Sequence, residues 1–355
     1  MKNINLDDQS IYTISDPGDM RCRLRDLPQQ CQDAWELAGN FILPEDYKRV
    51  NKVVILGMGG SAIGGDLIRS LAEAEAKSPV IIVRGYDLPK FVDEKTILIA
   101  SSYSGNTEET LSALAQADGT GAKILAITTG GKLTDYAKNK NTPVFAYNYP
   151  AQPRAALGYS FFPILRFLQQ LGIITDKSAE VTETVAVLED LLTEVAENTP
   201  TAQNPAKQMA QYLSDGLPVI YGAGILTEVA HRWKTQINEN SKAWAFYEVL
   251  PELNHNAVVG FPKPPAVAQS ARVIMLRSPL LGDRLLLRYR VTAELLARAG
   301  VSYQFCEAMG KSRVAQMMSL VMLGDYASYY LGILYGEDPS PVAVINYLKN
   351  ELAKG

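Results

Sequence analysis

Cysteine and histidine are scarce in this chain of 355 residues, which holds three of the former and two of the latter. Cys22, Cys31 and Cys306 are too few and too scattered for a disulfide framework. A closed zinc site needs about four nitrogen or sulfur ligands at close spacing, which His231, His255 and these cysteines can hardly supply. We therefore expect no metal and no other cofactor. Proton transfer near neutral pH would fall to a carboxylate, a lysine or a histidine.

Clusters of positive charge and long apolar runs are also lacking. The net charge is −4 without a run of Lys or Arg, which argues against a nucleic-acid partner. No apolar stretch approaches the roughly 18 residues that a membrane span requires. Residues 1–8 lack the apolar core of a signal peptide. These absences predict a cytoplasmic protein without a membrane partner.

Short apolar runs alternate with helical patterns along the chain, whose length suits two domains of roughly 150 residues each. Continuous apolar strands joined by helices indicate a parallel sheet covered on both faces. We interpret 57–65 as a glycine-rich loop, with a helix from about Asp66. The strands expected in the first half are residues 53–56, 79–83, 96–100, 123–128 and 144–146.

The pattern repeats in the second half. Residues 218–224 resemble residues 53–59 displaced by 165 positions, and 273–278 resemble the strand that ends at Ser102. A helical pattern over 181–195 and a breaker-rich stretch over 198–205 lie between the two halves. The chain therefore looks like two copies of one α/β unit.

The turn over residues 101–107 is the most informative feature. A buried strand ends there, and Glu108 begins a helical pattern, so the turn lies at a helix N-terminus with unpaired N–H groups. Ser102, Ser104 and Thr107 add hydroxyl groups, and Gly105 permits close approach of the backbone. Many neutral donors around a helix start suit a phosphate monoester. A capped helix with a solvated turn is the alternative.

The glycine-rich stretch 57–61 invites comparison with nucleotide-binding loops. It departs from G-x-G-x-x-G, the second strand ends in Arg84 rather than an acidic residue, and no Walker lysine is present. NAD and ATP are therefore disfavoured, and pure packing glycines remain an alternative. We interpret Gly59, Gly60 and Ser61 as facing the 101–107 turn across the carboxyl edge of the sheet, where doubly wound folds bind ligands.

Several motifs resemble those of the bifunctional phosphoglucose/phosphomannose isomerases, a sugar isomerase (SIS) domain family. Residues 57–66, 102–110 and 153–159 are similar to the family's first SIS domain. Residues 237–242, 252–256 and 338–342 are similar to its second half, in the right order. The resemblance implies two flavodoxin-like, doubly wound parallel-sheet domains in tandem and a homodimer. It also implies metal-independent interconversion of glucose 6-phosphate and mannose 6-phosphate with fructose 6-phosphate through a cis-enediol.

The resemblance also implies roles for four residues. Glu239 would be the base that moves a proton between C2 and C1, and His255 would open the sugar ring from the neighbouring subunit. Lys349 would assist proton handling during ring opening, and Arg154 would lie near the enediolate, where a fixed cation stabilises developing charge.

Without the resemblance, three of these residues have plainer interpretations. Glu239 would be a surface carboxylate paired with Lys242, His255 a hydrogen-bonded structural histidine, and Lys349 a solvated charge. A non-catalytic sugar-phosphate-binding protein of the same fold, a regulator or sensor, is the alternative function.

The expected domain organisation combines these observations. We expect a helical lead-in over 1–44, a phosphate-binding SIS domain over 45–172 and a connecting helix and linker over 173–205. A second SIS domain with the catalytic residues and a C-terminal helix would cover 206–355.

Overall fold

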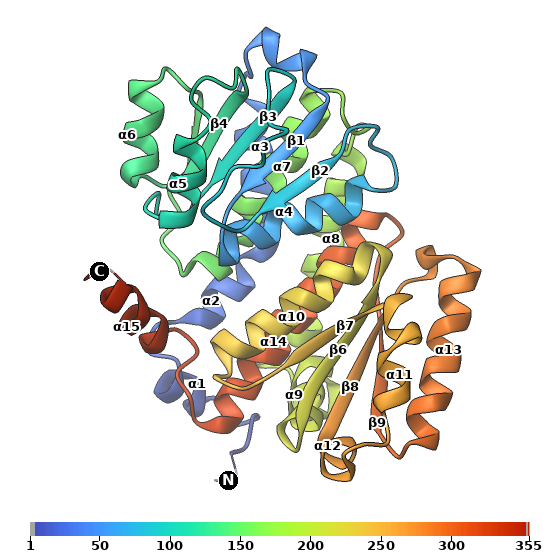
Figure 1. The fold of residues 1–355 in the computed structure, drawn as a ribbon. Coiled ribbons are helices and arrows are strands. Elements are labelled where there is room, and N and C mark those ends of the chain that lie inside the picture. The colour runs from blue at the N-terminus through green and yellow to red at the C-terminus, as the bar shows by residue number, and fades with distance from the viewer. Residues whose placement is uncertain (1–3, 353, 355) are drawn as a thin grey trace. The chain divides into compact units, whose positions relative to one another are not determined.

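The computed structural model describes residues 4–352 and Lys354 and divides the chain into two compact units (Figure 1). The sheet-A unit consists of Asp26–Leu188 and Gly310–Met318. The sheet-B unit consists of the chain up to Arg25, Glu189–Met309 and the chain from Ser319. The division falls inside helix α8 (Ser178–Val195), which covers the predicted helical pattern between the halves. The domain ranges given above stay a prediction.

Sheet A confirms the five strands predicted in the first half. They are all parallel, and their order is β2-β1-β3-β4-β5, the flavodoxin-like order. Val54 pairs with Leu98 and Ile55 with Ile82 in the register. The strands are β1 (Lys52–Leu56), β2 (Val80–Val83), β3 (Thr96–Ser101), β4 (Lys123–Thr128) and β5 (Val144–Ala146).

Helices cover both faces of sheet A. On one face, Leu114 of α5 and Leu133 of α6 pack into a core with Leu98. On the other face, α4 lies against Ile55 and Ile82, and α7 packs on both α4 and α3. The helices of this unit are α3 (Leu27–Gly39), α4 (Gly59–Ala72), α5 (Glu108–Ala115), α6 (Gly131–Asn139) and α7 (Leu157–Gln170).

Helix α4 begins at Gly59, so the expectation of a loop over 57–65 was wrong. At two of its glycines the neighbouring backbone comes so close that no side chain would fit. A Cβ at Gly60 would lie 2.7 Å from the carbonyl carbon of Pro153, and one at Gly64 would overlap the carbonyl oxygen of Ser160. Glycine weakens a helix by about 1 kcal/mol relative to alanine, and here close packing offsets that cost. Packing therefore requires glycine at positions 60 and 64, whereas a Cβ at Gly59 would meet nothing within 4 Å.

Sheet B repeats the plan of sheet A. Its strands are parallel in the order β7-β6-β8-β9, which matches β2-β1-β3-β4 of sheet A. β6 (Leu217–Ala223) and β8 (Ala271–Arg277) confirm the predicted pair, whereas β7 (Phe246–Leu250) and β9 (Ser302–Glu307) had not been predicted. Both unpredicted strands are edge strands with partly exposed side chains, so neither shows a continuous apolar run.

The helices of the sheet-B unit surround this sheet. Tyr289 and Leu296 of α13 pack with Val273 and Met275 on one face. The helices of this unit are α1 (Ser10–Ser15), α2 (Met20–Arg25), α9 (Pro205–Ser214), α10 (Thr227–Asn240), α11 (Ala257–Gly260), α12 (Pro265–Ser270), α13 (Asp283–Arg298), α15 (Ala343–Leu352) and, from Ser319 onward, α14 (Arg313–Tyr335).

Small residues on α14 bring α10 very close to it. A Cβ at Gly324 would overlap the indole nitrogen of Trp233, and one at Gly332 would lie 2.6 Å from the carbonyl oxygen of Asn240. Ser328, midway between them, accepts a hydrogen bond of 2.9 Å from the Asn240 amide. The carboxyl end of α10 is therefore fixed against α14.

Helix α14 is long and apolar enough, by length and composition, to cross a membrane. However, 89% of its most apolar window is buried inside the structure. A core helix accounts for these properties.

Candidate functional site

The 101–107 turn in the sheet-A unit is held by its own polar groups. The hydroxyls of Ser102 and Thr107 lie 2.8 Å apart, and the Gly105 N–H donates to the Ser102 hydroxyl at 3.1 Å. Gly105 has a φ of +67°, and a Cβ there would overlap the carbonyl oxygen of Gly130. The turn thus requires glycine at this position both for its backbone conformation and for space.

The hydroxyl groups of the turn are not used to cap α5. Thr107 occupies the N-cap position with φ −67° and ψ 118°, yet its side chain makes no capping hydrogen bond. In the first turn of α5, the buried Thr110 hydroxyl has no hydrogen-bond partner among the described residues. The helix start therefore keeps donor capacity, which argues against the interpretation as an ordinary capped helix.

The glycine-rich segment lies beside this turn, as predicted. The Ser61 hydroxyl accepts a hydrogen bond of 3.0 Å from the Tyr103 N–H, which joins the start of α4 to the turn after β3. Both segments follow the carboxyl ends of adjacent strands, because β1 and β3 are neighbours in the sheet. Gly59 is exposed and Gly60 half-buried at the same place.

Arg154 lies in a third segment that meets the other two. It belongs to the 3-10 helix Pro153–Ala155, whose backbone packs against Gly60. The turn itself contains no cation, and Glu108 and Glu109 occupy the first turn of α5. Arg154 is buried, with 3% exposure, on the segment whose backbone meets the start of α4. The structure brings all seven candidate residues of this unit to one edge of sheet A: Gly59, Gly60, Ser61, Ser102, Ser104, Thr107 and Arg154.

Glu239 lies in the sheet-B unit, half-buried near the carboxyl end of α10. The same helix carries a buried, two-pronged ion pair, in which Arg232 Nε and Nη2 bind the Asp325 carboxylate at 3.1 and 2.6 Å. The Lys242 ammonium donates to the carbonyl oxygens of Glu239 and Pro339 at 2.7 and 3.1 Å. These contacts hold the backbone around Glu239 in place on the sheet-B unit.

His255 ends a short 3-10 helix, Glu252–His255, that follows β7. The preceding residue, Asn254, is fixed by two hydrogen bonds. Its side-chain amide donates to the Thr292 hydroxyl at 2.8 Å, and its side-chain oxygen accepts from Arg288 at 3.0 Å. His255 itself is exposed and forms no hydrogen bond or ion pair with Glu239 among the described residues. It is therefore presented outward by a fixed segment rather than buried as a structural histidine.

Lys349 lies on α15, a helix that contains no buried residue. The apolar side chains of Val344, Tyr347, Leu348 and Leu352 are 56–82% exposed on this helix. Within the part of the chain that the structure describes, Lys349 makes no ion pair with Glu239. The three candidate residues of the sheet-B unit thus lie on three separate elements.

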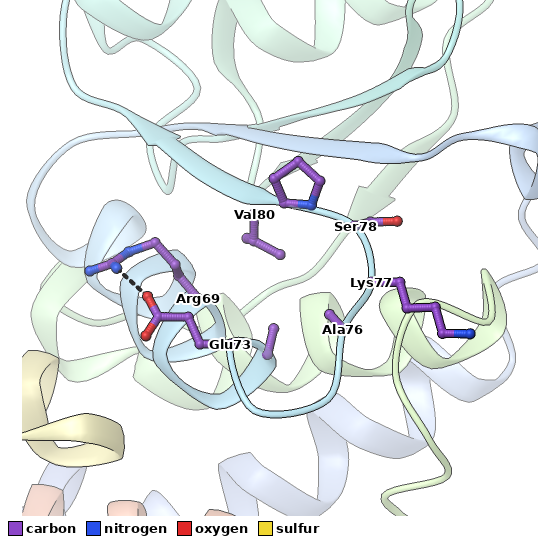
Figure 2. Close-up of a pocket in the computed structure, with 8 residues that line it drawn as sticks. Arg69, Glu73, Ala76, Lys77, Ser78 and Val80 are labelled. Atoms are coloured by element: carbon purple, nitrogen blue, oxygen red, sulfur yellow. Dashed lines mark hydrogen bonds and ion pairs between the residues drawn. The ribbon is translucent and has the colours of Figure 1, made fainter.

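A hollow of about 410 Å³ lies at the other edge of sheet A, beside the first residue of β2 (Figure 2). Arg69 and Glu73 form an ion pair at 2.7 Å on one side of it, and Lys77 extends away from that pair (Figure 2). None of the predicted site residues lines this hollow. It is therefore separate from the candidate site.

Two residues of the site were missed by the sequence analysis. Tyr103 hydrogen-bonds through its hydroxyl to the 149–151 segment, and Gln30 donates to the carbonyl oxygen of Ala155 at 3.0 Å. The position of Tyr103 inside the turn was the signal for the first. No sequence pattern marks Gln30, because it reaches the site from α3, far away along the chain.

Comparison with known proteins finds relatives of this chain in both sequence and fold. Residues 202–352 match the family model of the bacterial phospho-glucose isomerase C-terminal SIS domain. The chain is 46% identical over 329 residues to a bifunctional phosphoglucose/phosphomannose isomerase of Caldicellulosiruptor bescii, covering 92% of this chain and 97% of that protein. A protein of the same name from Aquifex aeolicus is 36% identical, with 91% and 95% covered. In fold, the chain is similar to a hypothetical protein of Thermus thermophilus, with a TM-score of 0.72, 18% identity and coverage of 98% and 94%.

Proposed function

The chain belongs to the family of bifunctional phosphoglucose/phosphomannose isomerases, and from this premise we propose that it interconverts glucose 6-phosphate and mannose 6-phosphate with fructose 6-phosphate. The observation that carries the proposal on this chain is the uncapped start of α5 beside the 101–107 turn. The turn would hold the 6-phosphate through N–H and hydroxyl donors of Ser102, Ser104 and Thr107, with Gly59, Gly60 and Ser61 beside them. The reaction needs no metal or cofactor in this proposal.

Glu239 is the proposed base. From the open-chain aldose, its carboxylate removes the proton on C2, the C–H electrons form the C1–C2 double bond, and O1 takes up a proton. The resulting cis-enediol regains a proton at C1 while O2 loses one, which gives the ketose. Arg154 would stabilise the charge that develops on the enediolate oxygens. Glucose and mannose phosphates share this enediol because C2 loses its stereochemistry in it.

His255 is the proposed acid–base group for ring opening, in the site of the partner subunit. Its exposure on an anchored segment supports this role, since a histidine that serves a neighbouring subunit must face outward. Phe246, 48% exposed, begins the edge strand β7, and Trp244, 79% exposed, lies just before it; both offer apolar surface for a second copy of the chain. We therefore propose a homodimer. Lys349 is proposed to assist ring opening, and the proposed location is the cytoplasm.

A coupled assay of the purified protein tests the proposed reaction. With fructose 6-phosphate and a chelator present, we expect both glucose 6-phosphate and mannose 6-phosphate to appear, because one enediol leads to both. The non-catalytic alternative predicts binding of fructose 6-phosphate without either product. The names of the curated relatives, which are those of enzymes, do not favour that alternative.

Mixed dimers test the donation of His255. Glu239→Gln and His255→Ala homodimers should each be inactive, since every site lacks one group. After subunit exchange, one of the two sites in a mixed dimer would contain both native groups. Because half of a random mixture consists of such mixed dimers, we expect recovery of roughly a quarter of the native activity per chain. Exchange verified by mass spectrometry without recovery would argue against a shared site.

A further inference from the structure

Tyr103 connects all the segments of the candidate site in the sheet-A unit. Its N–H donates to the Ser61 hydroxyl at 3.0 Å, and its carbonyl oxygen accepts from the N–H and hydroxyl of Thr129 at 3.1 and 2.7 Å. Its hydroxyl donates to the Tyr149 carbonyl oxygen at 2.7 Å and accepts from the Ala151 N–H at 2.9 Å. The main chain of this residue thus fixes the turn, and its side chain fixes another segment.

The segment held by the Tyr103 hydroxyl leads directly to Arg154. Ala151 is three residues upstream, and the intervening Pro153 lies against Gly60. On the other side, Gln30 of α3 donates to the carbonyl oxygen of Ala155 and to the Tyr149 hydroxyl, both at 3.0 Å. Residues 149–155 are therefore held by hydrogen bonds on two sides. Gln30 makes those on one side, and the Tyr103 hydroxyl makes those that link the segment to the 101–107 turn.

We propose that Tyr103 is a positioning residue that couples the 101–107 turn to Arg154. The inference rests on the proposed function, in which the turn holds the 6-phosphate and Arg154 stabilises the enediolate. The phenol bridges two main-chain groups and so fixes the segment that carries Arg154 relative to the turn that would anchor the substrate. Tyr103 would then affect the chemical step more than substrate binding.

Tyr103→Phe tests this role, because it removes the phenol oxygen and leaves every main-chain hydrogen bond of the turn. We expect kcat to fall about tenfold, as small misplacements of a catalytic group reduce rates strongly, with KM within about twofold. The matched control is Tyr147→Phe. The Tyr147 ring packs 6.2 Å from that of Tyr103, and its hydroxyl makes no hydrogen bond to another described residue. We expect kcat and KM of this control to stay within about twofold of the native values.

Amide hydrogen exchange provides a second readout that does not depend on turnover. Tyr103→Phe should speed exchange at Ala151 about tenfold or more, because its N–H loses its acceptor, and leave exchange at Gly105 unchanged. Unchanged exchange at Ala151, or a rise in KM without a fall in kcat, would overturn the proposed coupling. A native protein without isomerase activity would refute the proposed function instead, while the exchange result would still decide whether Tyr103 holds the segment.

Discussion

Replacing Glu239 with glutamine should lower kcat for isomerisation by about a thousandfold, within the range for removal of a general base. The amide has nearly the same shape as the carboxylate but cannot accept the C2 proton. KM should change little, because in the proposed function the phosphate is held by the turn in the sheet-A unit. Initial rates with fructose 6-phosphate, measured for both products, provide the test.

A surface carboxylate of the same unit serves as the control for this variant. Glu294 lies exposed on α13 and pairs with Arg290 at 3.2 Å, one helical turn away. Glu294→Gln should keep native kcat and KM. If Glu239→Gln retained a kcat within tenfold of the native value, Glu239 would not be the base. A comparable loss in both variants would mean that the effect is not specific to Glu239.

Replacing Gly105 with alanine should destabilise the protein by about 3 kcal/mol, the sum of a left-handed backbone and an overpacked contact. The new Cβ would overlap the Gly130 carbonyl oxygen, so either the turn or the start of α6 must move. Because displacement of the turn also moves the proposed phosphate donors, KM should rise about tenfold or more. Urea denaturation gives the first quantity and initial rates give the second.

Gly119→Ala separates the two contributions. Gly119 also has a left-handed backbone, with φ +84°, but a Cβ there would meet nothing within 4 Å. This variant should lose only about 1 kcal/mol and keep its native KM, since the strain is confined to a turn away from the site. Equal losses of stability in the two variants would mean that contact with Gly130 contributes nothing.

Local sequence patterns predicted the strands whose side chains are buried on both faces of a sheet. The strand Thr96–Ser101 is buried at every position, and its continuous apolar run was sufficient to identify it. Strand β7 was missed because it lies at the edge of sheet B and exposes Phe246 and Tyr247. The start of α4 was missed because glycine ordinarily disfavours a helix, whereas here the close contacts with Pro153 and Ser160 require glycine within one.

The candidate site shows the same division between local and distant information. Ser61 and the 101–107 turn could be predicted to meet, because both follow adjacent parallel strands at their carboxyl ends. The contact between Tyr103 and Ala151 could not be predicted, since it depends on the path of an irregular segment after β5. The contact of Gln30 with Ala155 could not be predicted either, because α3 lies far from that segment along the chain. Assigning Glu239, His255 and Lys349 required the family resemblance, and their roles stay predictions.

The close contact between α10 and α14 limits which amino-acid substitutions the protein can accept. The Trp233 indole of α10 rests on Gly324, and the α10 backbone at Asn240 rests on Gly332. A residue larger than glycine at either position would force α10 and α14 apart and so displace the helix that carries Glu239. The location of the proposed base therefore depends on these two glycines, neither of which lies in the candidate site.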